Sequence, residues 1–600
     1  MRKRAPAWLP TGEPGLVVLA LVIGAGTGLG AIAFRELITG ITHLVTGFND
    51  YSGQGRVPSR HVPGLGMWFL VLTPVVGGLI YGPLVARFAP EARGHGVPEV
   101  MLAVARQGGR IRLQVPIVKA LASAVCIGTG GSVGREGPIV QIGSALGSLV
   151  GQIADVSTRR LRLLVACGAA GGIAATFNAP IAGVFFALEV ILGDFETSAF
   201  GMVVLSSVIA NAVGRAAFGS ASFLHLPTFT LVSPLELLLY AGVGALAGAV
   251  GVVFIRVLYG SEDLADALWR GPEWARPAVG GVLLGLLLLA LPQLYGVGYP
   301  VLSHAVDGKI AIGLLVALLA GKIAATSLTI AIGGSGGVFA PSLFLGATLG
   351  SAIGHGLHAG LPGITAPSGA YALVAMGAVF AAAARAPITA VLIVFELTGE
   401  YSIILPLMIA VVVATSVSAA LSPDTIYTLK LRRRGIRVDQ PRVPSVMRTV
   451  TVADALAEAP PPLAPDTPVG EVLQRLTEGH YDAVPVVGGD GNLMGIVGLT
   501  DVEDHALDDE HPAIAADLAR QPPVLRTTDS LEEAARALDQ SETGVPALTA
   551  GSEEIAGWVT HRSVLRAYHR HRRALSGEGP PGESSSKAGR RSREPARAGG

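Results

Sequence analysis

A glycine-rich motif that occurs twice constrains the fold more than any other feature of the sequence. Residues 130–138 read GGSVGREGP, and residues 333–341 read GGSGGVFAP. Further glycine, leucine and serine positions match downstream of both motifs at the same offset. A second pair of segments, 179–189 and 386–396, follows at nearly that offset. Fixed spacing across two blocks indicates that two halves of the chain, about residues 15–220 and 232–425, share one structure.

Both halves lie in an apolar region. Residues 16–421 carry charges only in short clusters, and charge density rises after residue 430. Overall 15% of residues are charged, against about a quarter in soluble domains. We therefore expect lipid to surround the first part of the chain and water the second. Spans of membrane length are predicted at 15–34, 64–85, 161–176, 199–218, 235–258, 277–294, 310–332 and 403–420.

Other apolar segments are short and broken by proline. They fall at residues 138–153, 181–192, 338–357 and 371–395. A broken helix at membrane depth leaves backbone groups unsatisfied unless it is buried in protein or lines a watery path. Broken helices in duplicated halves are typical of transporters. The predicted class is therefore an all-α polytopic membrane domain over residues 15–435.

Basic residues indicate the orientation. They cluster before the first span, at Arg159–Arg162, and after the last span at Lys430 and Arg432 to Arg434. The positive-inside rule then places the N-terminus (residues 1–14) and the C-terminus in the cytoplasm. The first apolar run is expected to remain as a helix and not to be cleaved as a signal. The predicted location is the cell's inner membrane.

The region after residue 445 is also duplicated. Residues 446–508 and 509–570 each read as helix, short buried strand, turn, second strand and second helix. This pattern predicts a small α/β module present twice. Residues 574–600 are rich in Gly, Ser, Pro and Arg and are expected to be disordered.

Several functional classes are disfavoured. The formal net charge is zero, so nothing suggests nucleic acid as a partner. Cys126 and Cys167 lie in apolar stretches without metal-ligand spacing or a disulfide framework. The sequence has no phosphate loop, no metal-ligand cluster and no nucleophile with a paired base. We expect neither an enzyme nor a required cofactor.

Three Gly-Pro segments carry the chemistry. They are residues 94–98, 134–138 and 337–341, with Tyr427 as a fourth element. Glycine lets the backbone approach a ligand, and the N–H that proline lacks costs nothing near the first helical turn, where N–H groups have no partner within the helix. The free N–H groups of a helix N-terminus attract anions without a full charge. One such block alone would be an ordinary helix break, but three predict an anion path.

Glu136 stands inside the second block. A carboxylate at membrane depth is costly and usually functional. Ionised, Glu136 would compete with an anion for the same N–H groups, and protonated it would release them. The alternative is a structural ion pair with its neighbour Arg135.

These residues resemble the CLC family of chloride channels and chloride/proton antiporters over about residues 15–435. The resemblance implies inverted halves and a homodimer with one pore in each subunit. It makes Glu136 the gating glutamate, Tyr427 the residue whose hydroxyl closes the central site, and chloride the ligand. The module after residue 446 is similar to tandem CBS domains. The implied anion-binding residues are Gly94, His95, Gly96, Arg135, Gly137, Val338, Phe339, Ala340 and Tyr427.

Two positions depart from the family pattern. His95 stands where the family has a serine whose hydroxyl contacts the anion, so its imidazole either faces the anion or turns away. Val190 stands where many antiporters have a glutamate. Its neighbour Glu189 is expected to be structural or to lie on a water path. Lys119 either lines a vestibule or pairs with a carboxylate.

The CBS-like module keeps half of each nucleotide-binding pattern. Asp501 is present in the first repeat and Thr560 in the second, while Gly498 and Ser563 replace their expected partners. Binding of ATP or AMP and a purely structural role both stay open.

The sequence therefore predicts membrane transport of chloride or a similar anion through a glutamate-gated path, in a voltage- or pH-gated channel. A chloride/proton antiporter is the alternative. A CBS-regulated magnesium transporter is the alternative of another class, and the few acids at membrane depth disfavour it.

Overall fold

The computed structural model describes residues 13–195, 197–219, 231–436, 446–505, 513–541 and 543–576. The chain divides into two compact units, Met1–Asp439 and Gln440–Gly600. Most of the tail predicted to be disordered, and residues 1–12 of the predicted N-terminal segment, lie outside the described residues.

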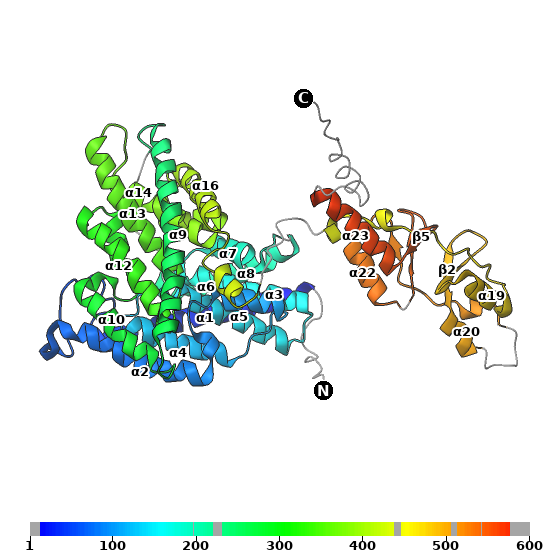
Figure 1. Ribbon diagram of the computed structural model, residues 1–600, viewed down its shortest axis with the longest axis horizontal. Helices are drawn as coiled ribbons and strands as arrows, with labels where there is room; N and C mark the ends of the chain where they lie inside the picture. Colours follow the sequence, from blue (N-terminus) through cyan, green and yellow to red (C-terminus); the bar gives the residue numbers. More distant parts are fainter. Residues whose placement is uncertain are drawn as a thin grey trace, which may run out of the picture. The chain divides into compact units, whose positions relative to one another are not determined.

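The first unit is helical, and its helices recur in the same order in both halves (Figure 1). The first half comprises α1 (Glu13–Thr46), α2 (Phe69–Phe88), α3 (Val97–Arg106), α4 (Gln114–Gly128), α5 (Glu136–Ile153), α6 (Thr158–Phe177), α7 (Pro180–Phe186), the π-helical η3 (Ala187–Leu192) and α8 (Thr197–Phe218). The second half comprises α9 (Glu236–Leu268), α10 (Arg276–Ala290), α11 (Tyr299–Val306), α12 (Ile312–Ala331), α13 (Phe339–Gly360), α14 (Ser368–Ala384), α15 (Pro387–Thr398), α16 (Ile404–Leu421) and α17 (Thr428–Arg433).

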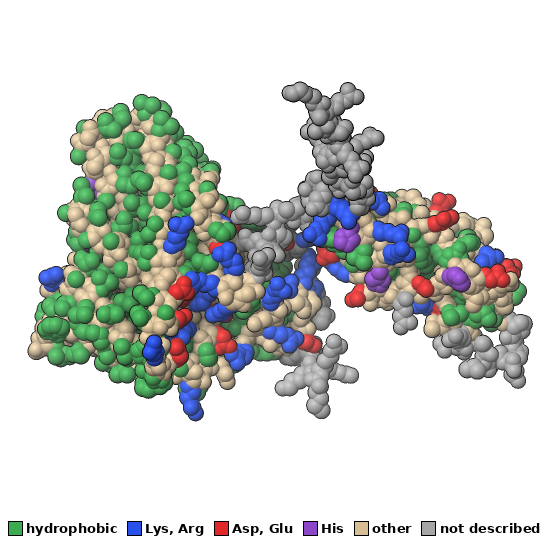
Figure 2. Space-filling model, viewed as in Figure 1, with side chains coloured by type: hydrophobic (Ala, Val, Ile, Leu, Met, Phe, Trp, Pro, Cys, Tyr) green, Lys and Arg blue, Asp and Glu red, His purple; other side chains and the backbone are tan. Residues whose placement is uncertain are grey.

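The composition of these helices fits a membrane. Within the described residues, 7 helices are long and apolar enough to cross a bilayer. Figure 2 shows the visible face of this unit covered mainly by hydrophobic side chains, with charged ones gathered in one region. The described apolar helices therefore support a multi-pass membrane protein.

The helix boundaries differ from the sequence-based prediction in two places. The spans predicted from hydropathy omit α3, α4 and α11, because these helices are short and α4 contains Lys119. The segment predicted at 371–395 is two helices. Arg385 adopts a left-handed conformation with φ 52° and closes α14, and Pro387 begins α15.

Small residues bring neighbouring helices together equivalently in the two halves. A side chain at Gly143 of α5 would collide with the carbonyl oxygen of Gly168 in α6. A side chain at Gly346 of α13 would collide with the carbonyl oxygen of Ala375 in α14. Close backbone approach at small residues is the usual basis of helix packing in membranes. This packing fixes the helices whose N-termini form the candidate site.

The second unit is an α/β module. In the first repeat, α19 (Val469–Gly479) precedes the antiparallel strands β1 (Ala483–Val487) and β2 (Leu493–Gly498), and α20 (Leu499–His505) follows. In the second, α22 (Leu531–Asp539) precedes antiparallel β4 (Val545–Leu548) and β5 (Ile555–Val559), and α23 (His561–Ser576) follows. The short strand β3 (Leu525–Arg526) pairs in parallel with β4. The predicted duplicated helix–strand–strand–helix pattern is confirmed.

Candidate functional site: an anion site at converging helix N-termini

The three Gly-Pro blocks meet through their backbones. Gly134 and Gly337 exchange two hydrogen bonds, with N···O distances of 2.7 and 2.6 Å. Gly94 N donates to the Gly334 carbonyl at 3.0 Å, and Gly336 N donates to the Gly94 carbonyl at 3.3 Å. Segments more than 200 residues apart in sequence therefore start α3, α5 and α13 from one place.

Glycine is required at two positions of this junction. Gly96 caps α3 with φ 81°, a conformation that other residues rarely adopt. A side chain at Gly137 would collide with the His95 carbonyl and press on Gly337. The absence of side chains here lets the tips of α3, α5 and α13 come together.

Glu136 lies at the junction and is 1% exposed. Its Oε2 accepts a hydrogen bond from Ala340 N at 3.3 Å, and its Oε1 accepts one from the Tyr299 hydroxyl at 2.6 Å. Ala340 is one of the three residues whose N–H groups are expected to contact chloride. The carboxylate therefore occupies a donor that an anion at the tip of α13 would need.

Arg135 points to other partners. Its guanidinium donates to the Thr176 carbonyl at 3.4 Å, and Cζ lies 4.9 Å from the centroid of the Tyr299 ring. None of the ion pairs found among the described residues joins Arg135 to Glu136. The geometry therefore gives no support to the alternative of a structural Arg135–Glu136 pair.

A small hollow lies beside the junction and contains part of the predicted site. Five predicted site residues do not line this hollow but belong to the surrounding backbone junction or its contacts; they are Gly94, His95, Gly96, Arg135 and Ala340. The hollow is lined by Val97, Glu136, Gly137, Val140, Ile173, Phe186, Val338, Phe339 and Tyr427.

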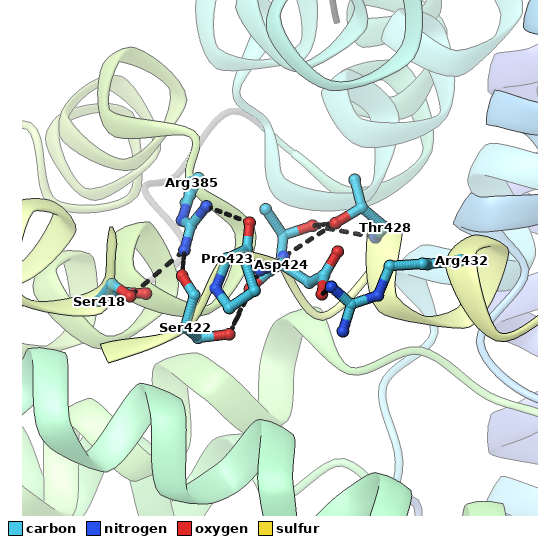
Figure 3. A network of polar contacts seen from close by, with 8 residues as sticks. Arg385, Ser418, Ser422, Pro423, Asp424, Thr428 and Arg432 are labelled. Carbon is cyan, nitrogen blue, oxygen red and sulfur yellow. Dashed lines mark hydrogen bonds and ion pairs between the residues drawn. The ribbon is translucent and has the colours of Figure 1, made fainter. Parts of the chain in front are cut away.

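Tyr427 follows a turn that polar contacts hold from several sides (Figure 3). Arg385 donates to the carbonyls of Ser418, Ser422 and Pro423. Asp424 and Arg432 form an ion pair at 2.6 Å across the turn.

The backbone and side chain of the tyrosine are equally constrained. Ile426 N, just before Tyr427, donates to the Ala383 carbonyl at 2.9 Å. The Tyr427 side chain is 2% exposed. The turn and the Ile426–Ala383 hydrogen bond therefore place the tyrosine at the hollow.

His95 is fully buried, and its ring is directed to α9. Its Nε2 lies 3.2 Å from the hydroxyl of Tyr259, and its ring centroid lies 6.1 Å from that of Tyr427. Of the two alternatives for this residue, the structure has the imidazole engaged with a protein partner.

Lys119 neither lines a vestibule nor pairs with a carboxylate through a hydrogen bond. It is fully buried, and its ammonium donates to the Ala92 carbonyl at 2.9 Å and the Gly94 carbonyl at 2.5 Å. Lys119 therefore holds the backbone of the first Gly-Pro block.

Lys322 is the matching residue of the second half, and sequence reasoning missed it. Its ammonium donates to Ser132 Oγ at 3.0 Å and to the carbonyls of Gly296 and Val297 at 3.2 and 3.0 Å. Lys119 and Lys322 are separated by the same interval as Gly130 and Gly333, so the repeat offset was a signal for this residue.

Tyr299 is the second residue that sequence reasoning missed. Residues 298–300 read Gly-Tyr-Pro and occupy the place in the second half that Gly96-Val-Pro holds in the first. Gly298 caps α11 with φ 91°. A fourth helix start thus lies at the junction and supplies the hydroxyl that contacts Glu136.

Glu189 and Glu396 cap helices of opposite halves. Glu189 accepts hydrogen bonds from the N–H groups of Ile388 and Thr389 at 3.3 and 2.9 Å, at the start of α15. Glu396 accepts from Ile181 and Ala182 at 2.9 and 2.7 Å, at the start of α7. Carboxylates at helix N-termini satisfy donors and complement the helix dipole. This geometry fits the structural alternative for Glu189.

In the second unit, the two predicted nucleotide-binding residues lie in equivalent turns. Asp501 Oδ2 accepts from Gly498 N at 2.7 Å and from Arg520 Nε at 3.0 Å. Thr560 Oγ1 accepts from Ser563 N at 3.1 Å. Each residue therefore already has a partner within its own repeat.

Comparison with known proteins agrees with the fold. The family model described as voltage gated chloride channel matches residues 77–419, and the CBS domain model matches residues 443–508 and 515–570. A protein named "Putative chloride channel protein ClcB-like" from Ralstonia nicotianae is 34% identical over 433 residues, covering 72% of this chain and 99% of the relative. An "H(+)/Cl(-) exchange transporter ClcA" from Vibrio parahaemolyticus is 38% identical over 356 residues, covering 58% and 76%.

A solved structure gives the same result. The X-ray structure of a slow cyanobacterial Cl⁻/H⁺ antiporter matches with a TM-score of 0.64 and 27% identity, covering 71% of this chain and 99% of that one. Two helical halves with broken helices at a shared junction define a membrane protein that transports anions. The chain belongs to the CLC family of voltage-gated chloride channels and carries tandem CBS domains at its C-terminus.

Proposed function

We propose that this protein exchanges chloride for protons across the cell membrane. Glu136 binds the proton, and its ionised carboxylate alternates with chloride at the start of α13. One observation carries the proposal: the Glu136 carboxylate accepts a hydrogen bond from Ala340 N, at the start of α13. The ionised carboxylate and an anion compete for this N–H group, and a proton on Glu136 favours the anion.

The exchange follows from charge and hydrogen bonding. The ionised carboxylate holds the helix tip as an internal anion. Protonation removes its charge, so the carboxyl group leaves and chloride takes the N–H groups of Phe339 and Ala340. When chloride departs, Glu136 releases its proton and returns. Neutral backbone donors bind an anion strongly enough for entry and weakly enough for release.

Exchange is favoured over the passive channel expected from the sequence. Several Vibrio relatives are named H⁺/Cl⁻ exchange transporters and the cyanobacterial structure is titled an antiporter, whereas the Ralstonia relative is named a putative chloride channel protein. Val190 is no argument against exchange, because the internal proton carrier can be another group. Membership of an anion-transport family also disfavours the magnesium transporter.

Reversal potential in a planar bilayer under combined chloride and pH gradients tests the proposal. The reversal potential of an exchanger shifts with the pH gradient, whereas that of a passive chloride pore does not. Glu136→Gln keeps the shape of the side chain but cannot ionise. We expect it to conduct chloride with no pH-dependent shift. A wild-type potential that ignores the pH gradient would refute exchange and restore the channel.

We further propose that the protein works as a homodimer with both termini in the cytoplasm, as the family resemblance implies. Exposed apolar side chains on neighbouring helices support a partner or lipid there, among them Ile181, Phe200, Ile388, Leu405 and Val412. The CBS pair is proposed to stabilise the assembly, and Asp501 and Thr560 would contact an adenine nucleotide if one binds. Cross-linking in native membranes tests the dimer, and ATP titration by calorimetry tests the nucleotide.

A further inference from the structure

The hydrogen bonds of His95 define a relay that ends beside Tyr427. His95 Nε2 lies 3.2 Å from the Tyr259 hydroxyl, and that hydroxyl donates to the Ile426 carbonyl at 2.5 Å. A hydroxyl group has one proton to donate. Since Tyr259 gives its proton to Ile426, His95 must donate from Nε2. The relay therefore runs from His95 Nε2–H through the Tyr259 hydroxyl to the Ile426 carbonyl.

The relay fixes the tautomer of His95. The proton of the neutral ring is on Nε2, so Nδ1 is a bare acceptor. Nδ1 is buried and has no hydrogen-bond partner in the part of the chain that the structure describes. A bare acceptor repels chloride, so neutral His95 cannot replace the serine hydroxyl of the family as a donor to the anion.

Charged groups around His95 oppose a second proton on the ring. Lys119 is bound to the Gly94 carbonyl, and a side chain on Gly94 would collide with the Lys430 ammonium. Arg434, in the same basic segment as Lys430, pairs with Glu99 at 2.8 Å. The nearby cations outnumber the nearby carboxylates. Full burial of the ring already disfavours a charge, and the cations add to this, so the imidazole is neutral and its function lies in Nε2.

The relay supplies a contact that the rest of the turn lacks. The contacts in Figure 3 hold the turn from the side of α14 and α16. The Ile426 carbonyl is held by Tyr259 alone among the described hydrogen bonds. Through it, the loop of the first Gly-Pro block is joined to the residue before Tyr427.

We propose that His95 is a positioning residue for Tyr427 and acts through Nε2 and Tyr259, not as a ligand of the anion. The proposal rests on the proposed function and on the role that the family resemblance implies for Tyr427, whose hydroxyl closes the central site. Loss of the relay leaves the Ile426 carbonyl without its donor, while Ile426 N stays bound to Ala383, and Tyr427 then shifts from its place in the path. Chloride then leaks without the step at Glu136 that couples it to protons.

Two amide substitutions separate this proposal from direct anion contact. In His95→Gln the amide nitrogen reaches the position of Nε2, and in His95→Asn it reaches that of Nδ1. Each variant is reconstituted as the full chain in liposomes. Chloride efflux and proton counterflow are then measured between pH 5 and 8. We expect His95→Gln to keep the wild-type ratio of chloride to protons at every pH, and His95→Asn to raise it about fivefold.

A double-mutant cycle with Tyr259 tests the relay itself. Tyr259→Phe should raise the ratio as much as His95→Asn does, and the double variant should match either single one, because both break one chain of contacts. Tyr240→Phe is the matched control, since Tyr240 is a buried tyrosine of the same helix that donates to Glu236. It should behave as wild type.

Each remaining outcome refutes either the relay or the proposed exchange. A leaky His95→Gln with a normal His95→Asn would show that Nδ1 contacts the anion and would refute the relay. Additive effects in the double variant, or none, would refute it too. If Tyr259→Phe does not elute as folded protein in size-exclusion chromatography, the Gln and Asn pair decides. Wild-type chloride flux without proton counterflow would refute exchange alone, because the relay can still be measured from the chloride rate.

Discussion

The Tyr299 hydroxyl donates to Glu136 Oε1 at 2.6 Å, so a residue of the second half holds the carboxylate that the first half supplies. Tyr299→Phe removes this donor and weakens the hold on the ionised carboxylate. A hydrogen bond to a charged group contributes about 1.5–3 kcal/mol, so we expect chloride efflux to rise by about tenfold or more. Efflux from liposomes measures the change. Tyr295→Phe is the control, because the hydroxyl of that buried tyrosine donates to Gly128 instead. Equal rates for both variants would contradict the role of Tyr299.

Lys119→Met tests the clamp on the first Gly-Pro block. The substitution leaves the Ala92 and Gly94 carbonyls without their buried donor. The block should loosen, and chloride affinity measured by calorimetry should fall by about tenfold. Lys309→Met, at an exposed lysine paired with Asp307, should leave affinity unchanged. Unaltered affinity in Lys119→Met would mean that α3 keeps its position without the clamp.

The reciprocal caps predict matched losses of stability. Glu189→Ala and Glu396→Ala each leave two N–H groups at a partly buried helix start without an acceptor, at a cost of about 1–3 kcal/mol. Thermal unfolding in detergent should show a lower midpoint for both. Glu189→Gln retains one acceptor oxygen and should lose less. Should alanine and glutamine variants unfold together with wild type, the caps contribute nothing to stability.

The second unit offers a test of pH dependence. Ser530 donates to the Glu533 carboxylate from its N–H and its hydroxyl, each at 2.9 Å, and these bonds lower the pKa of Glu533 below its ordinary 4.5. A lowered pKa in the folded state stabilises the fold above pH 4.5, and this contribution is lost as the pH falls through the lowered value. Hydrogen exchange at the start of α22 should be faster in Glu533→Gln than in wild type at pH 7.

The difference between these two proteins should shrink as the pH falls below 4.5. Ser530→Ala removes the hydroxyl donor and keeps the backbone N–H, so it should reduce the pH-dependent part. A constant difference between wild type and Glu533→Gln at all pH values would show that the contact acts through packing.

Much of the fold could be predicted from hydrophobic periodicity and from the internal repeat. The offset between Gly130 and Gly333 predicted two equivalent sets of helix starts, and the structure joins them at Gly134 and Gly337. Hydropathy did not find α4, because this helix has 15 residues, fewer than a membrane span requires.

The candidate site was predictable in its backbone and less so in its side chains. Lys322 and Tyr299 were within reach of the repeat offset had it been followed beyond the matched motifs. The contact of His95 with Tyr259 crosses 164 residues. No local spacing encodes such a contact, because it depends on how α9 packs against the first half.

The carboxylates that cap α7 and α15 affect where an anion can bind in the protein. Both helices begin with an Ala-Pro step and present the same kind of electropositive tip as the starts of α5 and α13. Glu396 and Glu189 already accept hydrogen bonds from the N–H groups of these helix starts, so a chloride ion finds no free donors there. The starts of α7 and α15 thus resemble the candidate anion site but are capped by the protein's own carboxylates, and in the proposed exchange this confines chloride to the site at Glu136.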